Sequence, residues 1–265
     1  MLAPKRSRSD LVVRPAANQD RALRLTERAR LLERRYGGYD SERVLAAAIN
    51  DVFPGRIAVV SSFGAESAVL LDLVARVAPA TPVIFLETGK HFPETLAYRD
   101  TLVERLGLTD LRSVAPAAED LAWADADGTL WKRNPDLCCR LRKVLPLERA
   151  LSGFSAWING RKRFQGAQRS AIPIFEAAES RIKVNPLASW DPARIQDAFR
   201  VRGLPAHPLA TAGFSSIGCA PCTTQGGGEA GSRSGRWQGQ EKTECGIHNA
   251  PWAGRPRGIG VKRVS

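Results

Sequence analysis

Five cysteines are the residues of this 265-residue sequence whose types and spacing most clearly indicate chemistry. Four form two close pairs, the adjacent Cys138 and Cys139 and the motif Cys219-Ala220-Pro221-Cys222, whereas Cys245 stands alone. Side chains of adjacent residues diverge along a helix or strand, so a Cys-Cys pair suits an object that accepts sulfurs at separated corners. A four-thiolate iron–sulfur cluster is such an object; a zinc ion or a disulfide is the alternative. The pairs therefore predict ligands, and Cys245 predicts a reactive thiol.

Composition limits the class of protein. Hydrophobic residues make up 43% of the chain, which is ample for a packed core, and no apolar run approaches the roughly 20 residues that a membrane helix needs. The N-terminus lacks the apolar centre of a secretory signal. We therefore expect a cytoplasmic protein with no membrane contact.

The net charge of +12 is concentrated at the two ends of the chain. Residues 1–35 contain ten Lys and Arg against four Asp and Glu, and residues 249–265 contain four Lys and Arg and no acid. The ends thus supply ten of the twelve charges, and the middle is almost neutral. A protein that binds a polynucleotide usually carries its basic face on the folded body, so we expect no nucleic-acid partner.

Short apolar runs alternate with helical patterns. The runs Arg56–Val60 and Pro82–Leu86 are followed by helical patterns at Glu66–Val77 and Pro93–Leu106. Strands that are apolar throughout are typical of a parallel sheet covered on both faces. The sequence therefore predicts an α/β fold, with a mostly parallel twisted sheet and helices on both faces. We expect further strands at 111–114, 155–159 and 181–184, and further helices at 21–35, 41–51, 137–151 and 192–202.

Polar, glycine-containing loops follow three of these expected strands. They are Ser61–Ser67, Glu87–Lys90 and Asn159–Arg163. In open parallel sheets ligands bind at the carboxyl ends of the strands, and glycine lets backbone N–H groups approach an anion at a helix N-terminus. The first loop lacks the lysine of a Walker A motif. Together the three loops predict a nucleotide site.

The order of these loops and cysteines resembles a known family. The sequence is similar, over most of residues 40–248, to the sulfonucleotide reductases of assimilatory sulfate reduction, specifically the iron–sulfur adenylyl-sulfate (APS) reductases. The resemblance rests on Ser61 to Ser67, Glu87-Thr88-Gly89 with Glu94-Thr95, Cys138-Cys139 with Lys143, Trp157 to Arg161, Gln168-Arg169, Val184 to Leu187, Ile217 to Cys222, Arg233 to Trp237 and Glu244 to His248.

The resemblance implies a fold, a cofactor and a reaction. The fold would be Rossmann-like, of the adenine-nucleotide alpha-hydrolase type, and one [4Fe-4S] cluster would bind Cys138, Cys139, Cys219 and Cys222. Cys245 would attack the sulfur of APS and carry an S-sulfocysteine, from which reduced thioredoxin releases sulfite. Relatives that prefer the 3′-phosphorylated substrate PAPS generally lack the two ligand pairs, so the resemblance points to APS.

The resemblance also implies substrate contacts. Lys143 lies four residues after Cys139, so one helical turn would place its ammonium between the cluster and the sulfate. Near the ribose, a carboxylate at Glu66 would repel a 3′-phosphate, although it equally fits an ordinary helix start. The expected substrate-binding residues are Ser61, Ser62, Phe63, Gly64, Ser67, Leu86, Thr88, Lys143, Gly160, Arg161, Arg169, Arg233, Arg236 and His248.

The chain is expected to divide into four parts. They are a basic helical extension (1–40), the nucleotide- and cluster-binding domain (41–224), a flexible catalytic tail (225–248) and a disordered basic extension (249–265). A tail that serves both APS and thioredoxin predicts that Cys245 is exposed or disordered without ligand. A homo-oligomer stays open, as do acceptance of PAPS, a tRNA-thiolating enzyme and a redox sensor that uses Cys245.

Overall fold

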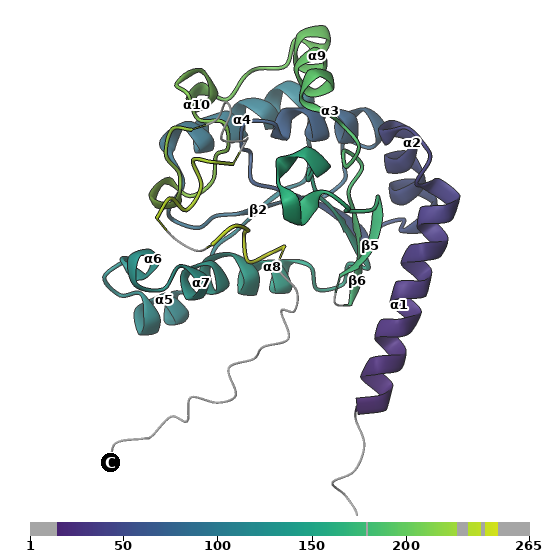
Figure 1. Cartoon of the computed structure of the whole chain (residues 1–265), viewed down its shortest axis with the longest axis horizontal. Coiled ribbons are helices and arrows are strands. Elements are labelled where there is room, and N and C mark those ends of the chain that lie inside the picture. The colour runs from purple at the N-terminus through teal and green to yellow at the C-terminus, as the bar shows by residue number, and fades with distance from the viewer. Residues whose placement is uncertain (1–14, 179, 227–232, 240–241, 249–265) are drawn as a thin grey trace, which may run out of the picture.

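One six-stranded sheet forms the centre of the computed structural model, which describes residues 15–178, 180–226, 233–239 and 242–248 (Figure 1). The strand order is β3-β2-β1-β4-β6-β5. All neighbours are parallel except β5, which is antiparallel to β6. The strands are β1 (Ile57–Ser61), β2 (Val83–Leu86), β3 (Leu111–Val114), β4 (Ala156–Ile158), β5 (Phe175–Ala178) and β6 (Arg181–Val184). The predicted mostly parallel α/β sheet is confirmed.

Helices cover both faces of this sheet, as the apolar runs predicted (Figure 1). On one face lie α2 (Ser41–Ala46), α3 (Ser67–Val77), α4 (Pro93–Leu106), α9 (Pro192–Arg202) and α10 (Pro208–Thr211). On the other lie α5 (Ala118–Ala124), α6 (Leu130–Arg133), α7 (Pro135–Cys139) and α8 (Leu145–Ala150). The remaining helical elements are α1 (Pro15–Tyr36), the π-helices η2 (Ala47–Val52) and η3 (Arg140–Val144), and the 3₁₀ turns η4 (Arg163–Gln165), η5 (Ala167–Arg169) and η6 (Ala220–Cys222).

Alternate residues of the central strands pack into two separate cores. Val59 and Phe85 belong to the larger core, which contains α3. Val60 and Trp157 belong to a smaller core with Leu147 of α8. Because successive side chains of a strand point to opposite faces, this division follows from the strands alone. It also places Trp157 on the face that carries α7 and α8.

The strand order reverses direction at β1. From β1 the chain proceeds outward to β2 and β3, and then returns to place β4 on the other side of β1. The loops that leave β1 and β4 therefore diverge and open a crevice at the carboxyl ends of the two strands. Two of the three predicted ligand loops, Ser61–Ser67 and Asn159–Arg163, leave these strands.

Several elements of the fold were not predicted, among them α5, α6 and α10, and two further differences bear on the site. The antiparallel strand β5 was missed, and the expected helix 137–151 is three segments, with the widened turn η3 between α7 and α8. Pro146 follows η3 and has no N–H to donate to the preceding turn. In the widened turn Leu145 N–H donates instead to Arg140, five residues earlier. This turn contains Lys143.

Helix α1 packs along β5 at one edge of the sheet. The carboxylate of Glu33 accepts hydrogen bonds from the backbone N–H groups of Ile174 at 3.3 Å and Phe175 at 2.7 Å. The basic extension predicted at 1–40 thus contacts the α/β domain directly where it is described. Residues 249–265, which were expected to be disordered, lie outside the described residues. Among the described residues, no helix combines the length and the apolar character needed to cross a membrane.

Candidate active site

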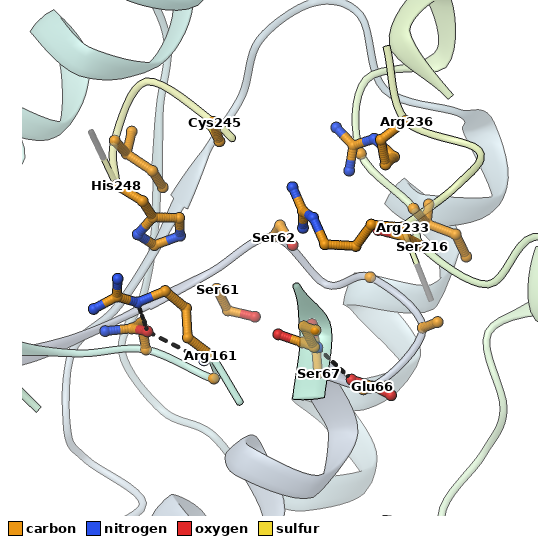
Figure 2. Close-up of a pocket in the computed structure, with 18 of the residues that line it drawn as sticks. Ser61, Ser62, Glu66, Ser67, Arg161, Ser216, Arg233, Arg236, Cys245 and His248 are labelled. Carbon is orange, nitrogen blue, oxygen red and sulfur yellow. Dashed lines mark hydrogen bonds between the residues drawn. The ribbon is translucent and has the colours of Figure 1, made fainter. Parts of the chain in front are cut away.

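A cavity of about 190 Å³ lies at the carboxyl ends of β1 and β4 (Figure 2). One side, here called the strand-end wall, consists of residues 60–62, 64–67, Leu86 and 159–162. The opposite side, here called the tail wall, comes from residues 233–239 and 242–248 and contributes Arg233, Arg236, Glu244, Cys245, Ile247 and His248. Residues 215–218 and Arg169 close the space between the walls.

The loop after β1 is fixed by short-range contacts. Ser61 Oγ accepts a hydrogen bond from the N–H of Phe63 at 3.2 Å, and Phe63 has a left-handed backbone with φ of 48°. A side chain at Gly64 would place its Cβ 3.0 Å from the carbonyl oxygen of Ile217, so glycine lets the two segments approach closely. The loop leads into α3, whose N-terminus points into the cavity and favours an anion or a polar ligand there.

The loop after β4 is held by the scaffold. Asn159 Oδ1 accepts from both the backbone N–H and Nε of Arg161, each at 3.1 Å. The Arg161 guanidinium also pairs with Glu176 and donates to Asn185 Oδ1 at 3.0 Å. Burial lowers the pKa of Arg161, although Glu176 opposes the shift. Arg161 lines the cavity, but its charge is already paired.

Glu66 lies in the strand-end wall beside a buried cation. Its Oε2 accepts from Lys162 Nζ at 2.6 Å and from Gln165 Nε2 at 2.7 Å. Lys162 is almost fully buried, and burial lowers its pKa while Glu66 opposes that change. The Glu66 carboxylate thus lines the cavity, and Lys162 offsets its charge.

His91 belongs to the cavity, although its sequence context gave no such indication. The ring donates from Nε2 to the carbonyl of Leu86 at 2.9 Å, which leaves Nδ1 as an acceptor. Nδ1 is buried and has no hydrogen-bond partner among the described residues. His91 therefore fixes the carbonyl of a predicted substrate-binding residue.

Trp237 organises the cations of the tail wall. The ring is 3% exposed, and the guanidinium carbons of Arg236 and Arg233 lie 4.5 and 5.2 Å from its centroid. Arg236 Nε also donates to the carbonyl of Cys222 at 3.1 Å. Gly218 makes room for Arg236, because a Cβ there would lie 2.3 Å from its Nη2. Aromatic stacking and a backbone contact thus orient both arginines toward the cavity.

Cys245 lies in the tail wall and faces the cavity. It is 9% exposed and lies among the described residues, so the expectation of an exposed or disordered thiol is wrong for this conformation, because the described part of the tail packs onto the body. A hydrogen bond from the Cys139 thiol, with the charges of Lys143 and Arg236 and the N–H of Ile247, lowers the pKa of Cys245. A lowered pKa favours the thiolate, which is the nucleophilic form.

His248 ends the described tail and stacks on the scaffold. The centroid of its ring lies 6.0 Å from that of Trp157, at an interplanar angle of 11°. The backbone N–H of His248 donates to the carbonyl of Cys245 at 2.9 Å. Burial, with the charges of Arg161 and Lys183, lowers the pKa of His248 well below its usual value. The imidazole is therefore neutral near pH 7.

The four paired cysteines meet beside Lys143. Asn134 caps α7 by accepting from the N–H of Leu137 at 2.9 Å, and this helix carries Cys138 and Cys139. The second pair is fixed to the loop after β2, because the backbone N–H of Ala220 donates to the carbonyl of Lys90 and Cys219 Sγ lies 3.4 Å from Thr88 Oγ1. All five cysteines are free, so the disulfide alternative is not observed.

The electrostatics of this region fit an anionic thiolate cofactor. Burial alone would lower the pKa of Lys143, but the neighbouring thiols of Cys219, Cys245 and Cys139 raise it above its usual value. Burial raises the pKa of Cys138 to about 11, and such a thiol loses its proton readily only to a metal. Within the described ranges, no three or more His, Cys, Asp or Glu side chains are grouped closely enough to hold one metal ion. Sulfurs spread around Lys143 are compatible with the corners of a larger cluster.

The cavity brings together most of the predicted residues. Its lining includes Ser61, Ser62, Gly64, Ser67, Leu86, Lys143, Gly160, Arg161, Arg169, Arg233, Arg236, Cys245 and His248. Two predicted residues lie beside it: Phe63 is buried in the larger core, and the Thr88 hydroxyl faces Cys219. Sequence reasoning missed His91, Gln165, Ser216 and Glu244. For Glu244 a signal existed, since a carboxylate directly before a nucleophile in a cationic site needs a partner.

Comparisons with known proteins agree with this geometry. The family model for the phosphoadenosine phosphosulfate reductase domain matches residues 56–225. A relative from Mesorhizobium japonicum named adenosine 5′-phosphosulfate reductase is 48% identical over 82% of this chain and 85% of its own. A relative from Gloeobacter violaceus named phosphoadenosine 5′-phosphosulfate reductase is 40% identical over 82% of this chain and 92% of its own.

A solved structure extends the likeness to the fold. The crystal structure of phosphoadenylyl-sulfate (PAPS) reductase from Candida auris, a phosphate complex, is similar at 26% identity and a TM-score of 0.61, over 81% of this chain and 99% of that one. The predicted family is thereby confirmed, and the tRNA-thiolating alternative is set aside. From its sequence, its sheet and the matched domain, the chain belongs to the family of phosphoadenosine phosphosulfate and adenosine 5′-phosphosulfate reductases.

Proposed function

We propose that this protein reduces APS to sulfite and AMP, with Cys245 as the nucleophile and reduced thioredoxin as the electron donor. The observation that carries the proposal is the position of the Cys245 thiol in a cavity that also contains Arg169, Arg233, Arg236 and Lys143. A thiolate with several cations around it suits attack on a substrate that carries phosphate and sulfate. The names of the relatives with 48% identity point to the same substrate.

The two walls divide the substrate between them. The strand-end wall offers backbone groups and hydroxyls, such as those of Ser61, Ser62 and Gly160, which suit the nucleoside. The tail wall offers guanidinium groups, which suit the phosphosulfate. A nucleotide bound in this orientation presents its sulfur to Cys245.

In the first half-reaction the Cys245 thiolate attacks the sulfur of APS. A bond forms between Sγ and this sulfur, the bond from sulfur to the bridging phosphate oxygen breaks, and AMP leaves with the electron pair. Arg233 and Arg236 stabilise the negative charge that develops on the leaving phosphate. The enzyme then carries an S-sulfocysteine at residue 245.

In the second half-reaction a thiolate of reduced thioredoxin attacks Sγ of the S-sulfocysteine. The bond between the two sulfurs breaks, and sulfite leaves with its electron pair. The second thiol of thioredoxin resolves the mixed disulfide and restores the Cys245 thiolate. Thioredoxin is oxidised to its disulfide, and the sulfur of the substrate is reduced by two electrons.

Cys138, Cys139, Cys219 and Cys222 would hold one [4Fe-4S] cluster. When bound, the cluster would supply a buried negative charge that keeps Lys143 protonated beside the sulfate. As a ligand, Cys139 can no longer donate its thiol proton to Cys245. The cations Lys143 and Arg236 and the N–H of Ile247 must then favour the thiolate by themselves.

The preference for APS over PAPS rests on the two ligand pairs and on the relatives named for APS. Glu66 adds less than its charge suggests, because Lys162 donates to the same carboxylate oxygen at 2.6 Å. We infer a cytoplasmic location, where thioredoxin is kept reduced and free cysteines persist.

The deciding experiment measures sulfite and AMP release by anaerobically purified protein with reduced thioredoxin, using APS and PAPS in parallel. We expect turnover of APS, a strong preference for APS over PAPS in kcat/KM, and about four irons per chain with broad visible absorbance. Cys219→Ser should lose iron and activity together, whereas Cys245→Ser should keep the iron. Turnover of neither nucleotide would contradict the proposal.

A further inference from the structure

Glu244 forms the most fully buried ion pair of the tail wall. Its Oε2 accepts from Arg169 Nε at 2.7 Å and its Oε1 from Arg169 Nη2 at 2.8 Å. Arg233 Nη2 donates to the same Oε1 at 3.2 Å. Glu244 and Arg169 are 5% and 6% exposed. Two parallel hydrogen bonds from one guanidinium edge are the geometry with which arginine also binds phosphate and sulfate.

The pair is a real charge pair rather than a neutral contact. Burial alone would raise the pKa of Glu244, but hydrogen bonds from Arg169 and the charges of Arg169 and Arg233 lower it. Positive charge still exceeds negative charge around it: burial and the charge of Arg169 lower the pKa of Arg233 to about 10. One carboxylate thus serves two guanidinium groups, and a second anion would relieve their repulsion.

Glu244 also occupies the position that a substrate anion needs. The Nε–Nη2 edge of Arg169 is taken by Glu244, and Arg169 Nη1 donates to Gln165 Oε1. Both arginines line the cavity, so a phosphosulfate can bind the Arg169 edge only after the carboxylate leaves. The same Oε1 accepts from the backbone N–H of Cys245 at 2.8 Å. Displacement of Glu244 therefore removes a contact that holds the nucleophile.

We propose that Glu244 is a stand-in for the substrate's anion: its carboxylate occupies the Arg169–Arg233 pair until the phosphosulfate displaces it and releases the backbone of Cys245. Glu244 is thus a positioning residue that couples anion binding to movement of the thiol. The inference rests on the proposed function for the identity of the anion. The bound Glu244 carboxylate lowers the apparent affinity for every ligand that must displace it.

Binding measurements on matched variants test this coupling. Calorimetry compares adenosine, AMP and APS in a Cys245→Ser background, which prevents turnover. Glu244→Gln keeps the size of the side chain but removes its charge, and Glu119→Gln, on an exposed position of α5, makes the same change of net charge elsewhere. We expect Glu244→Gln to bind AMP and APS at least about fivefold more tightly. Adenosine, which has no anion, should bind both variants equally.

The outcomes separate this inference from the proposed function. If AMP and APS bind Glu244→Gln no more tightly than Glu119→Gln, Glu244 only orients the arginines and the inference is overturned. If the unsubstituted protein binds neither adenosine nor AMP, that result contradicts the proposed function itself, and with it the inference that rests on it.

A second measurement needs no change at residue 244. Hydrogen exchange of the peptide 242–248 in unsubstituted protein should become faster with AMP and stay the same with adenosine. Slower or unchanged exchange with bound AMP would overturn the displacement even if Glu244→Gln does not fold.

Discussion

The two walls of the active-site cavity differ in how their charges are balanced. In the strand-end wall, Arg161 and Lys162 pair with Glu176 and Glu66 of the same scaffold. In the tail wall, Arg233 shares the carboxylate of Glu244 with Arg169, and no ion pair of Arg236 with a carboxylate is found among the described residues. A balanced wall fixed to strands suits the uncharged part of a nucleotide. An unbalanced wall on a chain terminus suits an anion that arrives and leaves during each turnover.

The largest effect is expected in the tail wall, at its nucleophile. Cys245→Ser should lower sulfite release by at least about a thousandfold, because the serine hydroxyl stays protonated where the thiol ionises. The cluster and AMP binding should be retained. Intact-mass analysis of unsubstituted protein with APS and no thioredoxin should find a sulfonate on Cys245. A sulfonate on Cys138 instead would assign the chemistry to the scaffold.

Acid should separate the stability of the scaffold from that of the tail. His207 is fully buried between α4 and α10, donates from Nε2 to Thr95 Oγ1 at 3.0 Å, and has a pKa lowered by burial to about 4. In the unfolded chain His207 gains a proton near pH 6.5, whereas in the folded chain it stays neutral until about pH 4. Stability should therefore fall by ~2 kcal/mol between pH 6.5 and 5 through this residue.

Urea unfolding at several pH values measures this fall. His207→Gln should flatten the dependence. His248→Gln should leave it unchanged, although burial lowers the pKa of His248 too, because we expect the tail to detach without unfolding the sheet. Equal flattening by both variants would mean that the tail belongs to the cooperative core.

Two arginines stack on tryptophan rings, one in the tail wall and one outside the residues that line the cavity, and their substitution compares the two places. Arg236 lies 4.5 Å from the Trp237 ring and Arg194 lies 4.2 Å from the Trp190 ring. Arg236→Ala should lower kcat/KM for APS by at least about tenfold, since a charge-assisted contact contributes about 1.5–3 kcal/mol. Arg194→Ala should change it by less than about twofold. Similar losses would remove the distinction between the two stacks.

Two glycines give the smallest and most local comparison. A Cβ at Gly218 would meet the Arg236 guanidinium at 2.3 Å, whereas a Cβ at Gly160 would meet Leu70 at an ordinary 3.7 Å. Gly218→Ala should therefore lower kcat/KM by about three- to tenfold with the iron content unchanged. Gly160→Ala should alter the unfolding free energy by less than ~0.5 kcal/mol. A larger loss of unfolding free energy in Gly160→Ala would mean that the strand-end wall packs around this glycine more tightly than the 3.7 Å distance to Leu70 indicates.

The sequence predicts the scaffold better than the tail for a physical reason. The central strands are continuous apolar runs, and the glycine loops follow them directly, so the crevice between β1 and β4 could be expected. Strand β5 was missed because Phe-Glu-Ala-Ala shows no alternation and its pairing depends on β6. Glu244 pairs with Arg169, 75 positions earlier in the chain, and no local pattern encodes such a contact. The burial of Cys245 depends on the same packing of the tail onto the body.

The helix α1 has a consequence for aggregation and assembly. An edge strand exposes backbone groups that recruit strands from other molecules. Here α1 lies along β5, and Glu33 occupies the N–H groups where that strand begins. At the opposite edge, β3 carries the exposed Arg112, paired with Asp110 just before the strand. Both edges of the sheet thus carry features that disfavour strand addition, and we expect loss of α1 to make the chain prone to aggregate.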